Sequence, residues 1–298
     1  MPRNKISSHI LDHLAQQRRV IVADWRFYVV YKAVARLFGY VPPGPTKVHQ
    51  VIRELCGSHA IGPVEGVSGV FRITIPYASI LPAPQEIVLQ EANPAAVFSD
   101  FTAAAYHNLT NEIPNGIYLT ASRGLSTRLP LGTSPEDWLD IPEPRRRTPR
   151  SIDETPVYWS QTKPEWDFGS AIGYCQGCPI YITDLERTLL DGLRCPGRSG
   201  DALEVLRMWK RAVTTVNLDT LIEYVSRFNQ TLLRQRVGFL LEQLGSTHRI
   251  LDEWATQSVR GSSARLIADR DFSPTFSKRW NLSINVPDAI LSELREDS

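Results

Sequence analysis

The sequence lacks the features that mark membrane-spanning, secreted and disulfide-stabilised chains. None of its apolar runs reaches 18 residues, so we expect no transmembrane helix. Residues 1–19 contain no continuous apolar core and do not have the pattern of a signal peptide, which makes the cytoplasm the expected location. Four cysteines among 298 residues are too few for a disulfide framework.

Signatures of nucleotide-binding and hydrolytic enzymes are missing as well. The chain has no G-x-S-x-G and no H-E-x-x-H sequence. Residues 197–200, Gly-Arg-Ser-Gly, precede a helix predicted from Asp201 to Val213, but they lack the lysine and the strand context of a phosphate-binding loop. We therefore expect no cofactor.

One pair of cysteines has a spacing used in metal and redox sites. Cys175 and Cys178 form a C-x-x-C sequence, and Cys195 follows, but no fourth zinc ligand stands beside Cys195. A thioredoxin-type motif would be followed by a helix, whereas Pro179 and the strand-like residues 180–182 follow here. We favour structural thiols over metal or redox chemistry and expect no metal.

Charge is present but unevenly distributed. Residues 1–80 contain ten basic and four acidic side chains, whereas the remainder contains 23 basic and 28 acidic ones. Four of the six histidines also lie in this basic segment. A basic module ahead of an acidic body is typical of a polyanion-binding head on a larger protein.

The basic segment has the pattern of three helices with a short strand after the first. Apolar residues at 6–14 have helical spacing, and a β-prone run follows at 20–22. Asp24 is expected to cap a second helix, which we expect to end at Gly39. Pro45 suits the first position of a third helix, after a proline-rich turn.

The third predicted helix carries the candidate DNA-reading face. Its apolar residues form a single stripe: Val48, Val51, Ile52 and Leu55. The other side carries side chains able to reach base edges and phosphates, and the N-terminal end is expected to present free backbone N–H groups to an anion. These side chains are Thr46, Lys47, His49, Gln50 and Arg53.

A β-hairpin is predicted next, with strands at 59–64 and 70–75. Three helices and a hairpin are the order of a winged helix-turn-helix, in which the third helix enters the major groove and the hairpin touches the DNA backbone. Arg72 is the predicted wing contact, and Arg18 and Arg19 complete the predicted DNA-binding set. The alternatives are a small α/β subdomain with an ordinary solvated face and a winged helix that binds protein.

Prolines mark the expected boundaries. Those between 76 and 84 separate a DNA-binding domain, residues 1–80, from a body at residues 85–298. A second proline-rich stretch, 130–164, is predicted to be a long irregular surface loop or a linker. Its arginine run, 145–147, is either a second phosphate contact or a solvated, mobile segment, and we favour the latter.

Three stretches of the body have non-random patterns, and the first covers residues 98–120. Ser99 is expected to cap a short alanine-rich helix, and a strand is predicted at 117–121. His107 at the end of this helix invites a catalytic interpretation. A lone histidine there more often caps the helix or makes a buried hydrogen bond, which we favour.

The second stretch runs from a predicted strand into a helix. Thr183 and Glu186 have capping-box spacing. Arg187 lies three residues after Asp184 and four before Asp191, so both carboxylates are expected to reach it. A catalytic cluster is one interpretation, and an internal ion-pair network, which we favour, is the other.

The third stretch, residues 224–245, is predicted to form helices with apolar faces, and Gly238 within it indicates tight helix packing.

In this order, behind a predicted winged helix, the three stretches resemble the AbiEi family of antitoxins from AbiE-type, type IV toxin–antitoxin systems. The resemblance extends to Arg279-Trp280-Asn281-Leu282 and Asn285. The family-motif residues are Ser99, His107, Thr110, Asp184, Arg187, Asp191 and Arg236.

The resemblance implies a two-part protein. The winged helix would bind inverted repeats in the double-stranded DNA of its own promoter and repress the operon, although this head has a longer second helix and a proline turn that the commoner family head lacks. The body would counteract a nucleotidyltransferase-class toxin by a direct complex, by reversal of the toxin's product or by modification of the toxin.

We therefore expect an α+β fold, with an N-terminal winged helix-turn-helix, a larger mixed α/β antitoxin domain and a helical C-terminal part. A non-enzymatic autoregulator is the main hypothesis. A ligand-sensing transcription factor is the first alternative and would need an apolar pocket with a few converging polar groups. An enzyme built around Asp184, Arg187 and Asp191 is the second, and would need these groups in an open cleft with perturbed pKa values.

Overall fold

The computed structural model describes residues 5–41, 44–74, 83–124, 128–139, 141, 143–258, 264–268 and 270–295. Pro76 and Pro82, expected to end the head, and Pro42 and Pro43 of the predicted turn lie outside these ranges. The described chain has an α+β fold and divides into two compact units. The first comprises the described residues of 1–97, 121–164 and 172–181, and the second those of 98–120, 165–171 and 182–298.

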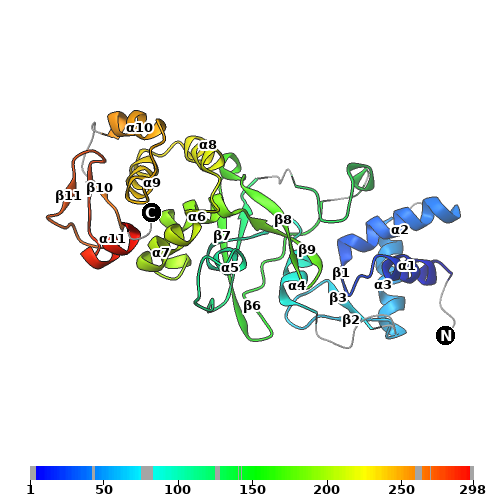
Figure 1. Cartoon of the computed structure of the whole chain (residues 1–298). Helices are drawn as coiled ribbons and strands as arrows, with labels where there is room; N and C mark the ends of the chain where they lie inside the picture. Colours follow the sequence, from blue (N-terminus) through cyan, green and yellow to red (C-terminus); the bar gives the residue numbers. More distant parts are fainter. Residues whose placement is uncertain are drawn as a thin grey trace. The chain divides into compact units, whose positions relative to one another are not determined.

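The first unit begins with three helices and a three-stranded sheet (Figure 1). Strand β3 lies between β1 and β2 and is antiparallel to both, with Arg72 opposite Ile21 and Gly62. The order is helix, strand, helix, helix, hairpin. The elements are α1 (Lys5–Gln16), β1 (Ile21–Ala23), α2 (Asp24–Phe38), α3 (Pro45–Gly57), β2 (Ile61–Pro63) and β3 (Val70–Ile73).

Local sequence accounts for these boundaries. The prediction that Asp24 caps α2 is wrong, because the N-cap is Ala23 and Asp24 is the first helical residue, whose carboxylate accepts the N–H of Trp25 at 2.8 Å. Gly39 ends α2 with a φ of 69°, a left-handed conformation that glycine adopts without steric cost. Pro45 occupies the first turn of α3, where its missing N–H removes no helical bond. The apolar faces of the three helices pack into one core with residues of β1, β2 and β3.

The rest of the first unit corrects the prediction of an irregular stretch at 130–164. Only part of it is irregular, because β6 (Ser151–Ile152) and β7 (Thr155–Thr162) pair as an antiparallel hairpin. Residues 155–162 are rich in β-branched and aromatic side chains, and this preference outweighs one proline near the start of the strand. The unit also contains α4 (Gln85–Ala92) and the short 3-10 helix η1 (Pro135–Trp138).

A six-stranded sheet has the order β6-β7-β5-β4-β9-β8. Its other strands are β4 (Val97–Phe98), β5 (Ile117–Ser122), β8 (Ser170–Cys175) and β9 (Cys178–Thr183). Strands β8 and β9 are joined by Gln176 and Gly177, both with positive φ, as a two-residue hairpin loop requires. The C-x-x-C sequence therefore spans a tight turn.

The Cys175 thiol of this turn is not activated as a nucleophile. All four cysteines are free, and burial together with the nearby Glu86 carboxylate raises the pKa of Cys175 to about 12. Cys175 is therefore a neutral thiol at physiological pH. Among the residues that the structure describes, no three side chains of the metal-ligating types are grouped to hold an ion.

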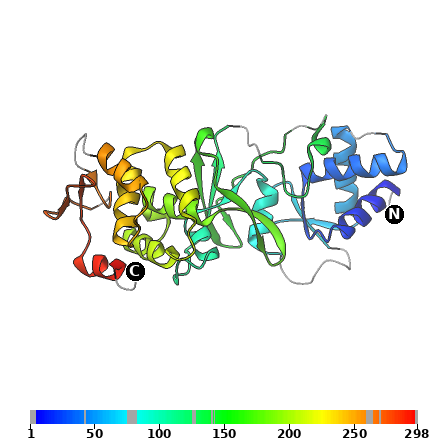
Figure 2. The ribbon, with the colours of Figure 1, turned by 45° about the horizontal axis from the view of Figure 1, so that its top comes forward.

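The second unit is mostly helical (Figure 2). Its core is formed by buried residues from α5 to α11 and from the segments between them. Gly238 in α9 lies against Trp280, and a Cβ added at Gly238 would come within 2.2 Å of that ring, so the predicted tight packing is confirmed. Within the described part of the chain, no helix is both long enough and apolar enough to span a bilayer.

The helices of the second unit are α5 (Asp100–Tyr106), α6 (Leu185–Arg194), α7 (Ala202–Ala212), α8 (Leu218–Phe228), α9 (Thr231–Gln243), α10 (Ile250–Ser258) and α11 (Asp288–Arg295). Its small sheet has β12 (Leu282–Ser283) between β10 (Ala264–Arg265), which is parallel to it, and β11 (Phe276–Ser277), which is antiparallel. Short 3-10 helices occur at Pro164–Trp166 and Pro196–Arg198.

Candidate nucleic-acid interface

Helix α3 has a buried apolar face and an exposed polar face. The apolar face is part of the core of the head, and the polar face carries all five side chains predicted to read DNA. The buried residues are Val48, Val51, Ile52 and Leu55. The exposed residues are Thr46, Lys47, His49, Gln50 and Arg53.

The chemistry of this face includes both donors and acceptors. His49 Nδ1 lies 2.7 Å from the carbonyl oxygen of Pro45, which can only accept, so Nδ1 carries the hydrogen and the neutral ring keeps Nε2 as an acceptor. Lys47 and Arg53 are donors, and the Gln50 amide is both. Such a set can bind phosphates and base edges alike.

The N-terminal end of α3 offers fewer free N–H groups than predicted. The N–H groups of Lys47 and Val48 both donate to the carbonyl of Gly44, at 3.1 and 3.2 Å, and Pro45 has no N–H. The first turn does lack an acidic residue that would repel a phosphate. Attraction of a polyanion to α3 therefore depends on its side chains more than on its backbone.

The hairpin contributes one basic residue. Arg72 is half-buried in the middle strand β3, whereas the tip carries the exposed Glu65. Glu65 lines a cavity together with Asp153 and Glu154 of the β6–β7 turn. Three carboxylates near the tip disfavour a phosphate there, which leaves Arg72 as the basic side chain among the described residues of β2, β3 and their turn.

The two arginines after α1 differ from each other. Arg18 is exposed and has a positive φ of 53°. Arg19 is directed into the protein, with Nη1 3.4 Å from Glu91 and Nη2 3.5 Å from the carbonyl of Leu131. Burial and the adjacent Arg26 lower the pKa of Arg19. We therefore remove Arg19 from the DNA-binding set.

Glu91 on α4 is the centre of a buried polar network that no sequence pattern predicted. Its carboxylate accepts the Nε–H of Arg26 at 2.8 and 2.9 Å and the backbone N–H of Ala23 at 3.2 Å. Only 2% of the Arg26 side chain and 4% of the Glu91 side chain are exposed. The indole of Trp25 also donates to the Glu91 carbonyl, at 2.9 Å. The head thus continues into α4.

The arginine run at 145–147 is partly solvated, as we favoured, because Arg145 and Arg146 are exposed, but two of its arginines also bond other parts of the first unit. Arg146 donates through Nη1 to the carbonyls of Gly124 and Ser122, at 2.7 and 3.3 Å. Arg147 forms an ion pair with Asp24. These bonds tie the segment to the first unit, although Arg146, like Arg145, is exposed.

In the second unit, the predicted capping box at the start of α6 is wrong. Asp184 is the N-cap, and its carboxylate accepts the N–H of Arg187 at 2.8 Å and the hydroxyl of Tyr224 at 2.7 Å. Thr183 bonds Thr188 instead. Two adjacent residues were suitable caps, and the path of the chain out of β9 brings Asp184 to the helix end.

Arg187 lies in a buried network, although only one of its two expected carboxylates reaches its guanidinium. Its Nε donates to Asp191 at 2.8 Å, and its Nη1 to the carbonyls of Trp166 and Phe168 at 2.6 and 2.8 Å. The guanidinium carbon lies 4.9 Å from the ring centre of Phe168 and 4.8 Å from that of Phe228. Arg187 is 3% exposed, so this cluster does not line an open cleft.

The remaining family-motif residues are also engaged internally. Ser99 precedes α5, but its hydroxyl bonds Asp100 and Thr120 rather than a helix N–H. The three others bond distant parts of the second unit: His107 Nε2 donates to the Thr183 carbonyl at 2.7 Å, Thr110 donates to Glu204 at 2.7 Å, and Arg236 donates to the Leu193 carbonyl at 3.0 Å.

Comparison with known proteins gives a likeness of fold only. No family model matches the chain, and no curated protein does. Among solved structures, the crystal structure of the RV2827C protein from Mycobacterium tuberculosis matches with a TM-score of 0.53 at 13% sequence identity. The match covers 98% of this chain and 95% of that one. The resemblance to AbiEi antitoxins therefore rests on the sequence motifs.

Proposed function

We propose that this chain is a cytoplasmic DNA-binding antitoxin that represses its own operon and counteracts a nucleotidyltransferase-class toxin. The DNA-binding part rests on one observation, the exposed face of α3, where Lys47, Gln50 and Arg53 stand opposite a fully buried stripe. The order of elements in the head is that of a winged helix-turn-helix, and we propose that α3 is its recognition helix. Inverted repeats in the chain's own promoter are the proposed target.

The antitoxin part is supported by the ordered motifs of the second unit. Catalysis is not part of the proposal, because Asp184, Arg187 and Asp191 are engaged in a helix cap and a buried ion pair. The proposed partner is the cognate toxin. We propose that it binds a surface of the second unit whose shape these residues stabilise, and that it does not contact these buried residues directly.

A salt titration of DNA binding tests the proposed interface. Fluorescence anisotropy with promoter DNA would compare the wild type with Arg53→Ala, Lys47→Ala and Arg72→Ala. If Arg53 reads a base, its removal costs about 1–3 kcal/mol and relaxes specificity at one position. Removal of Lys47 or Arg72 weakens binding to all sequences and lowers the salt slope by about 1 for each phosphate that the side chain neutralises.

Arg249→Ala is the matched control, because it removes the same charge from an exposed arginine of the second unit. It is expected to leave promoter affinity unchanged. A Lys47→Ala/Arg53→Ala double variant that binds the promoter as the wild type does would overturn the assignment of α3.

Point variants are preferable to truncation for separating the two activities. A cut between residues 80 and 85 would remove Ala23, Trp25 and Arg26, which all bond Glu91, and would uncover the surface that α4 shares with the head. The full-length Lys47→Ala/Arg53→Ala variant should lose repression of a promoter reporter and still protect cells that express the cognate toxin. Loss of both functions in a normally folded variant would mean that the head takes part in neutralisation.

A further inference from the structure

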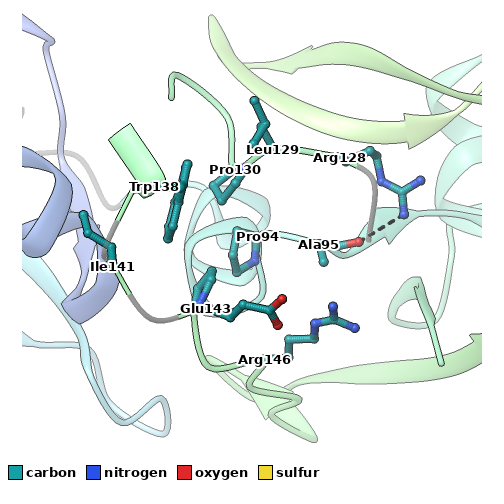
Figure 3. A pocket seen from close by; sticks show the side chains of 10 residues that line it. Pro94, Ala95, Arg128, Leu129, Pro130, Trp138, Ile141, Glu143 and Arg146 are labelled. Atoms are coloured by element: carbon teal, nitrogen blue, oxygen red, sulfur yellow. Dashed lines mark hydrogen bonds between the residues drawn. The ribbon is translucent and has the colours of Figure 1, made fainter. Parts of the chain in front are cut away.

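The first unit contains a cavity of about 240 Å³ that the proposed function does not use (Figure 3). Pro94, Pro130 and Trp138 contribute rigid apolar walls, and Arg128, Glu143 and Arg146 contribute charged groups. Trp138 lies on one side and the two arginines on the other (Figure 3). The volume is below the roughly 300–1,000 Å³ of a drug-sized site, so it suits a molecule of one or two fused rings.

The lining determines the chemistry of the ligand. A flat ring can stack on the indole face of Trp138, and prolines lose almost no side-chain entropy when they pack against it. Two arginines against one glutamate leave a net positive charge, and a guanidinium binds a carboxylate through paired hydrogen bonds. Arg146 is already held in place by two backbone carbonyls, which it bonds through Nη1.

The walls of this cavity also hold the head in place. The Trp138 ring lies 5.6 Å from that of Trp25, at the start of α2. The carbonyl of Leu131, next to Pro130, accepts Nη2 of Arg26 at 3.0 Å. Lys32, also on α2, donates to the carbonyl of Leu139, next to Trp138 in sequence. A shift of Trp138 or of the adjoining backbone therefore changes contacts of α2. Helix α2 packs against α3 in the same core.

We infer that this cavity is an effector site for a small aromatic carboxylate, and that its occupancy changes the affinity of the head for DNA. The first half stands on the cavity alone, and the second rests on the proposed function. Coupling between the two sites must be reciprocal, so DNA changes the affinity for the carboxylate by the same factor.

Calorimetric titration of the full chain tests the site. Benzoate, 2-naphthoate and indole-3-carboxylate are the probes, and 2-naphthamide is the uncharged counterpart of 2-naphthoate. We expect 2-naphthoate to bind at least about tenfold more tightly than the amide, Arg146→Gln to abolish that preference, and Trp138→Leu to weaken both ligands. Arg150→Ala, which removes an exposed arginine that does not line the cavity, should leave binding unchanged.

No binding of any of the three carboxylates would overturn the site, as would equal affinity for the naphthoate and the amide. Because Arg146 and Trp138 also support the fold, thermal melts of each variant are recorded. If Arg146→Gln melts as the wild type does and still prefers the carboxylate, the assignment of Arg146 is wrong.

Promoter binding with and without saturating 2-naphthoate tests the coupling. We expect the dissociation constant for DNA to change by about fivefold or more, within the usual range of allosteric coupling, and the change to disappear in Arg146→Gln. A ligand that binds without altering DNA affinity would overturn the regulatory half. A chain that binds no promoter DNA at all would refute the proposed function, while the calorimetric titration would still decide the site.

Discussion

Helix α3 of the first unit and helix α6 of the second use similar side chains in opposite ways. On α3, Lys47 and Arg53 are exposed. On α6, Arg187 and Asp191 are buried and bonded to each other. Charged residues at helical spacing therefore do not by themselves indicate a functional site. On α6 they complete the packing of the unit, whereas on α3 the apolar stripe packs the helix and the charges remain available to a partner.

The largest effect on folding stability should come from removing one partner of the buried Arg187–Asp191 ion pair of α6. Arg187→Ala leaves the Asp191 carboxylate buried with only Arg194, at 2.8 Å, and should lower the free energy of unfolding by about 3–5 kcal/mol. Arg249→Ala is the control, because it removes an exposed arginine of the same unit, and surface changes of this kind stay within about 0.5 kcal/mol. Urea denaturation measures both.

The same variant distinguishes structure from function. If Arg187→Ala melts as the wild type does and fails to protect cells from the toxin, the α6 network is functional and the comparison with α3 fails. Reduced stability with protection retained at low temperature would support the structural role.

A smaller loss of folding stability is expected when α9 is overpacked at Gly238. Gly238→Ala places a methyl group where the Trp280 ring lies, and should destabilise the chain by about 1–3 kcal/mol. Gly57, in the last turn of α3, has no neighbour within 4 Å of the corresponding position, so Gly57→Ala should be neutral or stabilising. Thermal melts compare the two, and equal melting temperatures would contradict the packing account.

Variants of the α3 face should have the smallest effect on folding. Lys47→Ala and Arg53→Ala remove exposed side chains, and surface changes of this kind stay within about 0.5 kcal/mol. Their urea midpoints should therefore match the wild type, so that any loss of promoter affinity reports on binding. A large loss of stability in either would show that the face takes part in packing.

The sequence predicted those features that depend on residues close together in the chain. The stripe of α3, the stop at Gly39 and the close packing at Gly238 depend on spacing or on one glycine, so periodicity was enough. The cap of α6 was ambiguous because Thr183 and Asp184 both suit the position, and only the exit from β9 decides between them.

The polar centre of the first unit could not be predicted, because its partners are far apart in sequence. Glu91 pairs with Arg26, 65 residues earlier. The cavity of the first unit is lined by Pro94 and Ala95 and by residues between 128 and 146, a proline-rich segment that has no periodicity. An acidic residue in the apolar run 87–92 was the available sign that a buried basic partner exists.

A final prediction concerns pH and a buried carboxylate of the second unit. Asp100 is 4% exposed and lies 3.0 Å from Nε of Arg198. Burial, with a smaller contribution from the nearby Asp191, raises the pKa of Asp100 despite that arginine. The folded chain therefore keeps a proton on Asp100 at pH values where the unfolded chain has lost it, and stability contributed by this group falls as pH rises through that window.

Asp100→Asn removes this titration and keeps the positive φ of 52°, which asparagine tolerates as aspartate does. Urea midpoints of the two chains, measured from acidic to neutral pH, give a difference in which the carboxylates that do not interact with Asp100 cancel. The wild type should lose stability relative to Asp100→Asn as pH rises from the unfolded pKa of the carboxyl through its raised folded value. A difference that moves the other way would mean that the ion pair with Arg198 dominates over burial, and that this carboxylate is held charged in the core of the unit.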